Sequence, residues 1–185
     1  RFAKKAIAKG ADGVIAVAAG AGGHAGALSP FALVQEIREW FDGPLLLSGS
    51  IANGDAVLAS QAMGADLAYI GSAFIATDEA NAVQGYKQSV VDNNAEDIVL
   101  SNLFTGVSGN YLKPSIEAAG LDPSNLPTSD ASKMSFGSGS DSESKAWKDI
   151  WGCGQGIGAV KSVQTTEALV GRLSAEYRAA KSRLV

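Results

Sequence analysis

Three short apolar segments, each followed by a loop of small residues and then by a helical segment, constrain the fold of this chain most. The apolar segments are Gly13–Ala18, Leu45–Leu47 and Leu67–Ile70. Runs that are apolar throughout are typical of strands in parallel sheets. Strands that alternate with helices predict β–α units, in which each helix crosses back over the sheet. The sequence therefore predicts an α/β fold with a parallel sheet.

The predicted helices have recognisable start signals. Ser29 and Pro30 provide an N-cap and a first-turn proline for one helix, and Asn53 can cap the next, Asp55–Met63. A long final helix is expected from about Thr166, because apolar side chains recur there at helical spacing. The phrase Gly-Ala-Asp stands before a strand twice, which indicates that one β–α unit is repeated.

Beyond about residue 80 the pattern changes. We expect residues 1–80 to form the β–α units, residues 81–150 a smaller, mostly helical segment, and residues 151–185 a return segment whose helix packs on those units. Residues 128–144 include seven serines, which predicts a flexible loop. The chain begins at Arg1 within a helical pattern and without a methionine, so we expect it to be the C-terminal part of a longer protein.

Composition and charge argue against several classes of protein. Fifteen basic against nineteen acidic residues give a net charge of −4, and no cluster of Lys and Arg offers a surface for nucleic acid. The longest apolar run, Val14–Ala19, is too short to cross a membrane. The single cysteine, Cys153, allows no intrachain disulfide and is typical of a reducing compartment, so a cytoplasmic protein is expected. One histidine and one distant cysteine do not make a metal-ligand cluster, so no metal is expected.

All three predicted strands end in small residues. The loops contain Gly20–His24, Ser48–Ser50 and Gly71–Ser72. Because the C-terminal ends of parallel strands share one edge, where ligands bind, we expect these loops to meet. Backbone N–H groups in glycine loops, helped by a following helix N-terminus, can bind a phosphate. A compact turn without a ligand is the alternative for any one loop, but the three together favour a phosphate site.

His24 is the only histidine of the chain and ends the first glycine loop. Imidazole titrates near neutral pH, so at this edge His24 can bind an anionic substrate or exchange a proton. A lone histidine is more often a hydrogen-bonded structural residue. Its position in the loop favours the functional interpretation.

Several motifs carry a likeness to a known family. They are Ala21–Gly26, Ser48–Gly54, Gly64–Glu79 and the late motif Trp151–Gly156. Together they resemble the nitronate monooxygenases, formerly called 2-nitropropane dioxygenases, and the match is good from Ala3 to about Lys87. The resemblance implies an FMN-dependent (β/α)8 TIM-type barrel, of which only the C-terminal part is present. Residues 81–150 would form an inserted segment on the substrate side.

The resemblance also implies roles for individual residues. Those expected to contact FMN are Gly22, Gly23, Gly49, Ser50, Gly71, Ser72 and Gln155. His24 would be the catalytic histidine, which holds the negative charge of the nitro group or takes the α-proton of a nitroalkane. In this family a nitronate gives an electron to FMN, and reaction with dioxygen yields a carbonyl compound and nitrite. NAD(P)H is a further candidate partner, and the missing N-terminal part of the same protein would complete the barrel.

Other classes stay open. NAD(P)H:quinone reductases and flavin-dependent enoyl-ACP reductases share the barrel and the Gly-Gly-His loop. Enzymes of the IMP dehydrogenase type have similar phosphate loops, but they need a cysteine nucleophile on an active-site loop, and Cys153 is far along the chain. A flavin-free binding module is the non-enzymatic alternative. Val17 and Gly20 stand where the family often has a glutamine and a glutamate, so the substrate is less constrained than the cofactor.

Overall fold

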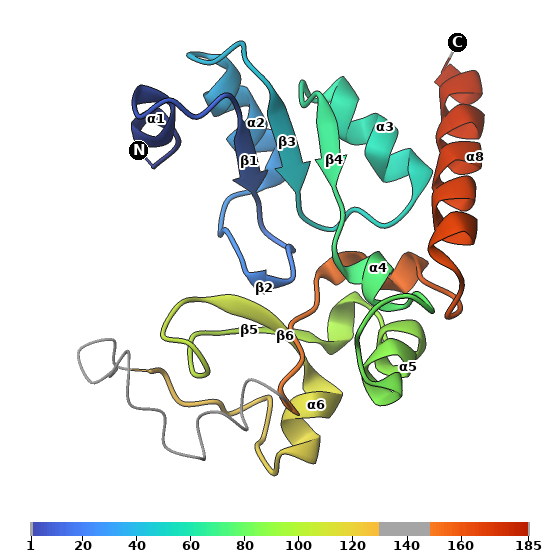
Figure 1. The fold of residues 1–185 in the computed structure, drawn as a ribbon. Coiled ribbons are helices and arrows are strands. Elements are labelled where there is room, and N and C mark those ends of the chain that lie inside the picture. The colour runs from blue at the N-terminus through green and yellow to red at the C-terminus, as the bar shows by residue number, and fades with distance from the viewer. Residues whose placement is uncertain (1, 130–148, 185) are drawn as a thin grey trace.

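Three parallel strands form the central sheet of the structure, a computed structural model that describes residues 2–129 and 149–184 (Figure 1). The strands are β1 (Val14–Val17), β3 (Leu45–Ser48) and β4 (Leu67–Tyr69), and their order is β1-β3-β4. Val14 pairs with Leu45, and Leu46 pairs with Leu67, so the strands begin at about the same level. The three predicted strands and their parallel arrangement are thereby confirmed.

Helices cover one face of this sheet. α2 (Pro30–Arg38) and α3 (Gly54–Ala62) lie behind it in Figure 1, and α1 (Phe2–Ala8) precedes β1. Alternate strand side chains are buried with Val34 and Ile37 of α2; they are Val14, Ala16, Leu45 and Leu47. On the other face, four side chains are 41–56% exposed: Ile15, Val17, Leu67 and Tyr69. The apolar runs predict that both faces of the parallel sheet are buried. Within the described ranges, only the face that packs against the helices is covered.

A second, antiparallel sheet lies beyond the C-terminal ends of the parallel strands (Figure 1). Its strands are β2 (Gly23–His24), β6 (Gly109–Leu112) and β5 (Ile98–Ser101), in the order β2-β6-β5. Because β2 continues the first glycine loop, this sheet attaches that loop to the hairpin of β5 and β6, which lies far along the chain. The sequence did not predict the sheet, since β2 has only two residues and the burial of β6 does not alternate.

The part of the chain after residue 80 combines helices with this hairpin. Between residues 81 and 129 the helices are α5 (Gln84–Asp92), the 3₁₀ helix η1 (Ala95–Asp97) and α6 (Lys113–Ala118). Val90, Leu112 and the 3₁₀ helix η3 (Gln155–Ala159) share one apolar cluster with the short α4 (Ser72–Ile75). Residues 130–148, which hold nearly all of the predicted serine-rich loop 128–144, lie outside the described residues.

The final helix, α8 (Thr166–Leu184), packs against α3 (Figure 1). Gly54 permits the close approach, because a Cβ atom there would lie 2.1 Å from the backbone nitrogen of Tyr177. The Gly54 N–H also donates a hydrogen bond to Glu176 Oε2 at 2.9 Å. Among the helices of residues 2–129 and 149–184, none has the length and apolar character needed to cross a membrane.

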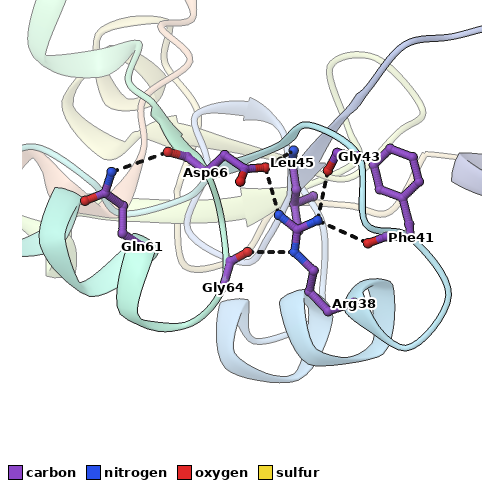
Figure 2. Close-up of polar contacts among 7 residues, drawn as sticks. All are labelled: Arg38, Phe41, Gly43, Leu45, Gln61, Gly64 and Asp66. Carbon is purple, nitrogen blue, oxygen red and sulfur yellow. Dashed lines mark hydrogen bonds and ion pairs between the residues drawn. The ribbon is translucent and has the colours of Figure 1, made fainter.

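Arg38, the last residue of α2, holds together the edge of the sheet where the strands begin (Figure 2). Its guanidinium donates hydrogen bonds of 2.7–3.1 Å to three backbone carbonyl oxygens, those of Phe41, Gly43 and Gly64. Its Nη2 atom pairs with Asp66 Oδ2 at 2.8 Å, and the same oxygen accepts the Leu45 N–H at 2.7 Å. One side chain thereby joins α2 to the starts of β3 and β4, at the edge opposite to the glycine loops.

The Asp66 carboxylate makes the stability of the fold depend on pH. Hydrogen bonds from the Leu45 N–H, and then from Arg38, lower its pKa below the ordinary value of 3.8. A lowered pKa in the folded state stabilises the fold above the ordinary pKa, and this stabilisation is lost as the pH falls through the lower value. We therefore expect Asp66→Asn to be less stable than the wild type at neutral pH, with a difference that narrows in acid. Denaturant unfolding at a series of pH values measures it.

Glu117→Gln is the matched control, because this exposed carboxylate lies on α6, away from Arg38. We expect it to change stability little at any pH. If the deficit of Asp66→Asn were the same in acid as at neutral pH, the charge of the carboxylate would not be what Arg38 and Leu45 stabilise.

Candidate functional site

A hollow lies where the C-terminal ends of the three parallel strands meet. It contains about 280 Å³ of open space, including the solvent at its mouth. Four segments that are far apart in the sequence line it: residues 20–22, residues 48–52, Tyr69 with Gly71 and Ser72, and Gly154 with Gly156. The first three are the predicted strand-end loops, so the expectation that these loops meet at one edge is confirmed.

The predicted site residues divide into two groups. Five of them line the hollow: Gly22, Gly49, Ser50, Gly71 and Ser72. Gly23 and His24 follow directly as strand β2, while Gln155 stands between two lining glycines and donates its N–H to Gly20 O at 2.9 Å. These three residues are therefore next in sequence to residues that line the hollow, but they do not line it themselves.

The late motif is pressed against the first loop, backbone against backbone. A Cβ atom on Gly154 would lie 2.7 Å from Gly20 O and 2.9 Å from Gly22 N, so only glycine fits there. The Gly154 N–H donates to Ser72 Oγ at 2.9 Å, which ties the motif to the third loop as well. The sequence reasoning missed Gly154 and Gly156 as lining residues, although the alternation of glycines around Gln155 was a usable signal.

The second loop is held in an unusual backbone conformation. Gly49 has φ +140°, and Ser50, with φ +56°, is the one non-glycine residue with positive φ in the described part of the chain. The Ser50 N–H donates to Gly20 O at 3.3 Å, so it is engaged by the first loop. Asn53 then caps α3 as predicted, because its Oδ1 atom accepts the Ala56 N–H at 2.8 Å.

The third loop presents unengaged backbone donors to the hollow. Within residues 2–129 and 149–184, no acceptor takes the N–H of Gly71 or that of Ser72. A Cβ atom on Gly71 would meet nothing within 4 Å, so there is room beside these donors for a ligand. Unsatisfied N–H groups next to glycine loops fit the chemistry of a phosphate group.

His24 is held by the second sheet. Its Nε2 atom lies 3.0 Å from Oγ1 of Thr105, a buried residue in the loop between β5 and β6. The same sheet fastens the first loop, since Asn110 Nδ2 donates to the Ala21 carbonyl oxygen at 2.7 Å. Thr105 and Asn110 could not be found from the sequence, because nothing in their local pattern places them beside the glycine loop.

Cys153 lies beside the first loop in space, although it is far from it in the sequence. The residue is fully buried, and burial raises the pKa of its thiol to about 11, partly offset by hydrogen bonds with Ser72 and the Gly154 backbone. It is therefore a neutral, packed thiol, which does not fit the nucleophile of an IMP dehydrogenase-type enzyme. In the described ranges, no group of three or more His, Cys, Asp or Glu residues is arranged to hold a metal ion.

The sequence model of the nitronate monooxygenase family matches residues 1–176. The chain belongs to this family. It is similar to a probable nitronate monooxygenase of Staphylococcus saprophyticus, with 34% identity over 108 residues, which are 52% of this chain and 30% of that protein. A nitronate monooxygenase of Paraburkholderia phytofirmans is 29% identical over 125 residues, which are 63% of this chain and 34% of that protein. The matched region thus spans about a third of each of these curated nitronate monooxygenases.

Solved structures share the fold over 99% of this chain. FabK from Thermotoga maritima has a TM-score of 0.77 at 24% identity, and the match covers 60% of its chain. A nitroalkane oxidase from Streptomyces ansochromogenes has a TM-score of 0.73 at 28% identity, and the match covers 56% of its chain. The predicted fold class is confirmed: the three β–α units of this chain correspond to part of a TIM-type barrel.

Gly154→Ala tests the close approach of the late motif to the first loop. The added methyl group would collide with two backbone atoms, Gly20 O and Gly22 N, which cannot rotate away. Denaturant titrations should show a loss of about 1–3 kcal/mol in the free energy of unfolding, which is typical of overpacked sites. Gly171→Ala on α8, where a Cβ meets nothing within 4 Å, is the control and should lose none. Equal stability of the two variants would contradict the contact.

Proposed function

We propose that this chain forms part of an FMN-dependent enzyme that uses dioxygen to oxidise alkyl nitronates to a carbonyl compound and nitrite. The observation that carries the proposal is the meeting of three strand-end loops and the late motif at one hollow, with His24 on the strand that continues the first loop. Membership of the nitronate monooxygenase family supports the substrate class. The similarity to a nitroalkane oxidase supports oxidation at the carbon atom that bears the nitro group.

Backbone donors would hold the FMN phosphate. The N–H groups of Gly71 and Ser72 are the best placed, because they line the hollow and no acceptor in the described ranges takes them. Gly49 also lines the hollow and would contribute through its backbone, since the place of a side chain there is filled by Ala18 and Ala19. The Ser50 N–H is engaged by Gly20, so Ser50 would contribute through its exposed side chain instead. Each charge-assisted hydrogen bond of this kind is typically worth about 1.5–3 kcal/mol.

The flavin ring would lie on the side of the first loop. Gly22 and Gly23 would lie near the ring, and Gly23 leaves room for it, because a Cβ atom there would meet nothing within 4 Å. Gln155 flanks the same loop through its N–H bond to Gly20. Bound FMN would supply the redox chemistry, by accepting electrons from the nitronate and passing them to dioxygen. His24 would hold the negative charge of the nitro group, or take the α-proton of a neutral nitroalkane.

The complete protein would need more strands than this chain supplies. β1 and β4 are the outer strands of the parallel sheet, and the sheet face away from the helices carries half-exposed apolar side chains. We propose that further strands of the same protein, N-terminal to this chain, close the barrel over that face. Residues 1–185 alone would then aggregate or bind FMN poorly. A soluble monomer of this span that binds FMN tightly would contradict this part of the proposal.

The flavin spectrum of the complete protein, followed by anaerobic additions, tests the function. We expect a yellow protein that releases FMN on denaturation, and whose flavin is reduced by an alkyl nitronate. In air, the same nitronate should cause oxygen uptake and release of nitrite. His24→Ala should keep the yellow colour but lose nitrite formation by about a hundredfold or more, the usual share of acid–base catalysis.

Other outcomes would point to the alternatives. Rapid flavin reduction by NADH, without oxygen uptake on adding a nitronate, would replace the proposal by an NAD(P)H-dependent quinone or enoyl reductase. A colourless protein that binds no added FMN would favour a binding module. Nitronate turnover that is unaffected in His24→Ala would remove the proposed role of the histidine.

Gly71→Ala tests the phosphate site separately from the ring site. The methyl group fits the protein without a clash, so the variant should fold and melt like the wild type. It would stand beside the free N–H groups and block the phosphate, so we expect FMN to bind about tenfold more weakly. Riboflavin, which has the ring but no phosphate, should bind both proteins equally. Flavin fluorescence quenching measures both affinities, and an equal loss for riboflavin would contradict the assignment.

A further inference from the structure

Thr105 contacts His24 through a hydroxyl group whose hydrogen bonds can be counted. Its Oγ1 atom lies 3.0 Å from His24 Nε2, 2.9 Å from the Val107 carbonyl oxygen and 3.3 Å from the Val107 nitrogen. Thr105 itself is buried, with 7% of its surface exposed, whereas its partners His24 and Val107 are exposed. No feature of the sequence connects Thr105 with the histidine.

Proton counting assigns a direction to each bond. A hydroxyl group has one proton to donate. The Val107 carbonyl oxygen has no proton, so it can only act as an acceptor. All three contacts are satisfied as hydrogen bonds only when the threonine proton goes to Val107 O and Oγ1 accepts from the Val107 N–H. In that arrangement His24 donates the third hydrogen bond, and Nε2 carries a proton. The tautomer of a histidine is commonly set in this way, by the partner of one ring nitrogen.

We propose that Thr105 is a positioning residue that fixes the orientation of the His24 ring and its Nε2–H tautomer. In the neutral ring, this tautomer makes Nδ1 the basic nitrogen. The consequence for catalysis rests on the proposed function: a histidine that takes the α-proton of a nitroalkane would use Nδ1, and Thr105 would keep it in that state. Thr105 itself would not touch the substrate.

The hairpin holds Thr105 in place relative to the histidine. β2 pairs with β6, with His24 opposite Gly109, and the Ala25 N–H donates to the Ser108 carbonyl oxygen at 3.1 Å. Within the loop, the Gly106 N–H donates to Asn102 O at 2.8 Å. Backbone bonds on both sides of the contact therefore fix the distance between the two side chains.

Nitrogen NMR of the imidazole tests the proposal in the complete, flavin-loaded protein. The His24 signals are identified as those that disappear in His24→Asn. The wild type should show a protonated Nε2 and an unprotonated Nδ1 at a pH where the ring is neutral. Thr105→Val, which has the same shape but no hydroxyl group, should lose this preference and show a mixture of tautomers. Thr105→Ser should restore the wild-type spectrum.

Turnover gives the second measurement. We expect Thr105→Val to lower kcat for a nitroalkane about tenfold or more with FMN affinity unchanged, and Thr105→Ser to recover most of it. Val107→Ala is the matched control, because only the backbone of Val107 is used and its side chain is 52% exposed. It should change neither the tautomer nor kcat.

Two results would overturn the proposal. One is a wild-type His24 that carries its proton on Nδ1, which decides the question even if Thr105→Val does not fold. The other is an unchanged Nε2–H tautomer in Thr105→Val. If the tautomer responds as expected but His24→Asn retains nitronate turnover, the positioning by Thr105 stands and the proposed function fails.

Discussion

The contact between the first glycine loop and the late motif is the constraint on which the site depends. Residues 20–22 and residues 153–154 approach so closely that a methyl group on Gly22 or on Gly154 would strike backbone atoms of the other segment. Because the late motif also bonds to Ser72, this single contact brings the first and third loops to the same hollow. Glycine is needed here for close approach, which is a different requirement from the backbone flexibility it gives to turns.

The residues that stabilise the sheet and the residues that can bind a ligand lie at opposite ends of its strands. At the edge where the strands begin, Arg38 and Asp66 form charged hydrogen bonds to backbone groups of the neighbouring segments. At the opposite edge the loops consist of small residues. The N–H groups of Gly71 and Ser72 there donate to no acceptor among the described residues. This division is the usual one for parallel β–α folds, in which loops at the C-terminal ends of strands bind the ligand.

Local patterns were enough to predict the part of the site that comes from consecutive β–α units. The apolar run Leu45–Leu47 and the cap at Asn53 fixed a strand and a helix, and the glycine loop between them followed from both. The hairpin could not be predicted, because β2 has two residues and gains its partner from the distant β6. Thr105 was hidden for the same reason: its importance arises from a tertiary contact and leaves no periodic signal. Cys153 shows that separation along the chain is a poor guide to separation in space.

A crystal structure of the complete protein with FMN bound is the most direct test of this arrangement. We expect phosphate oxygens within hydrogen-bond distance, about 2.7–3.2 Å, of the backbone nitrogens of Gly71 and Ser72, with the flavin ring on the side of Gly22. A phosphate group bound elsewhere, with these two N–H groups facing only solvent, would contradict the central claim.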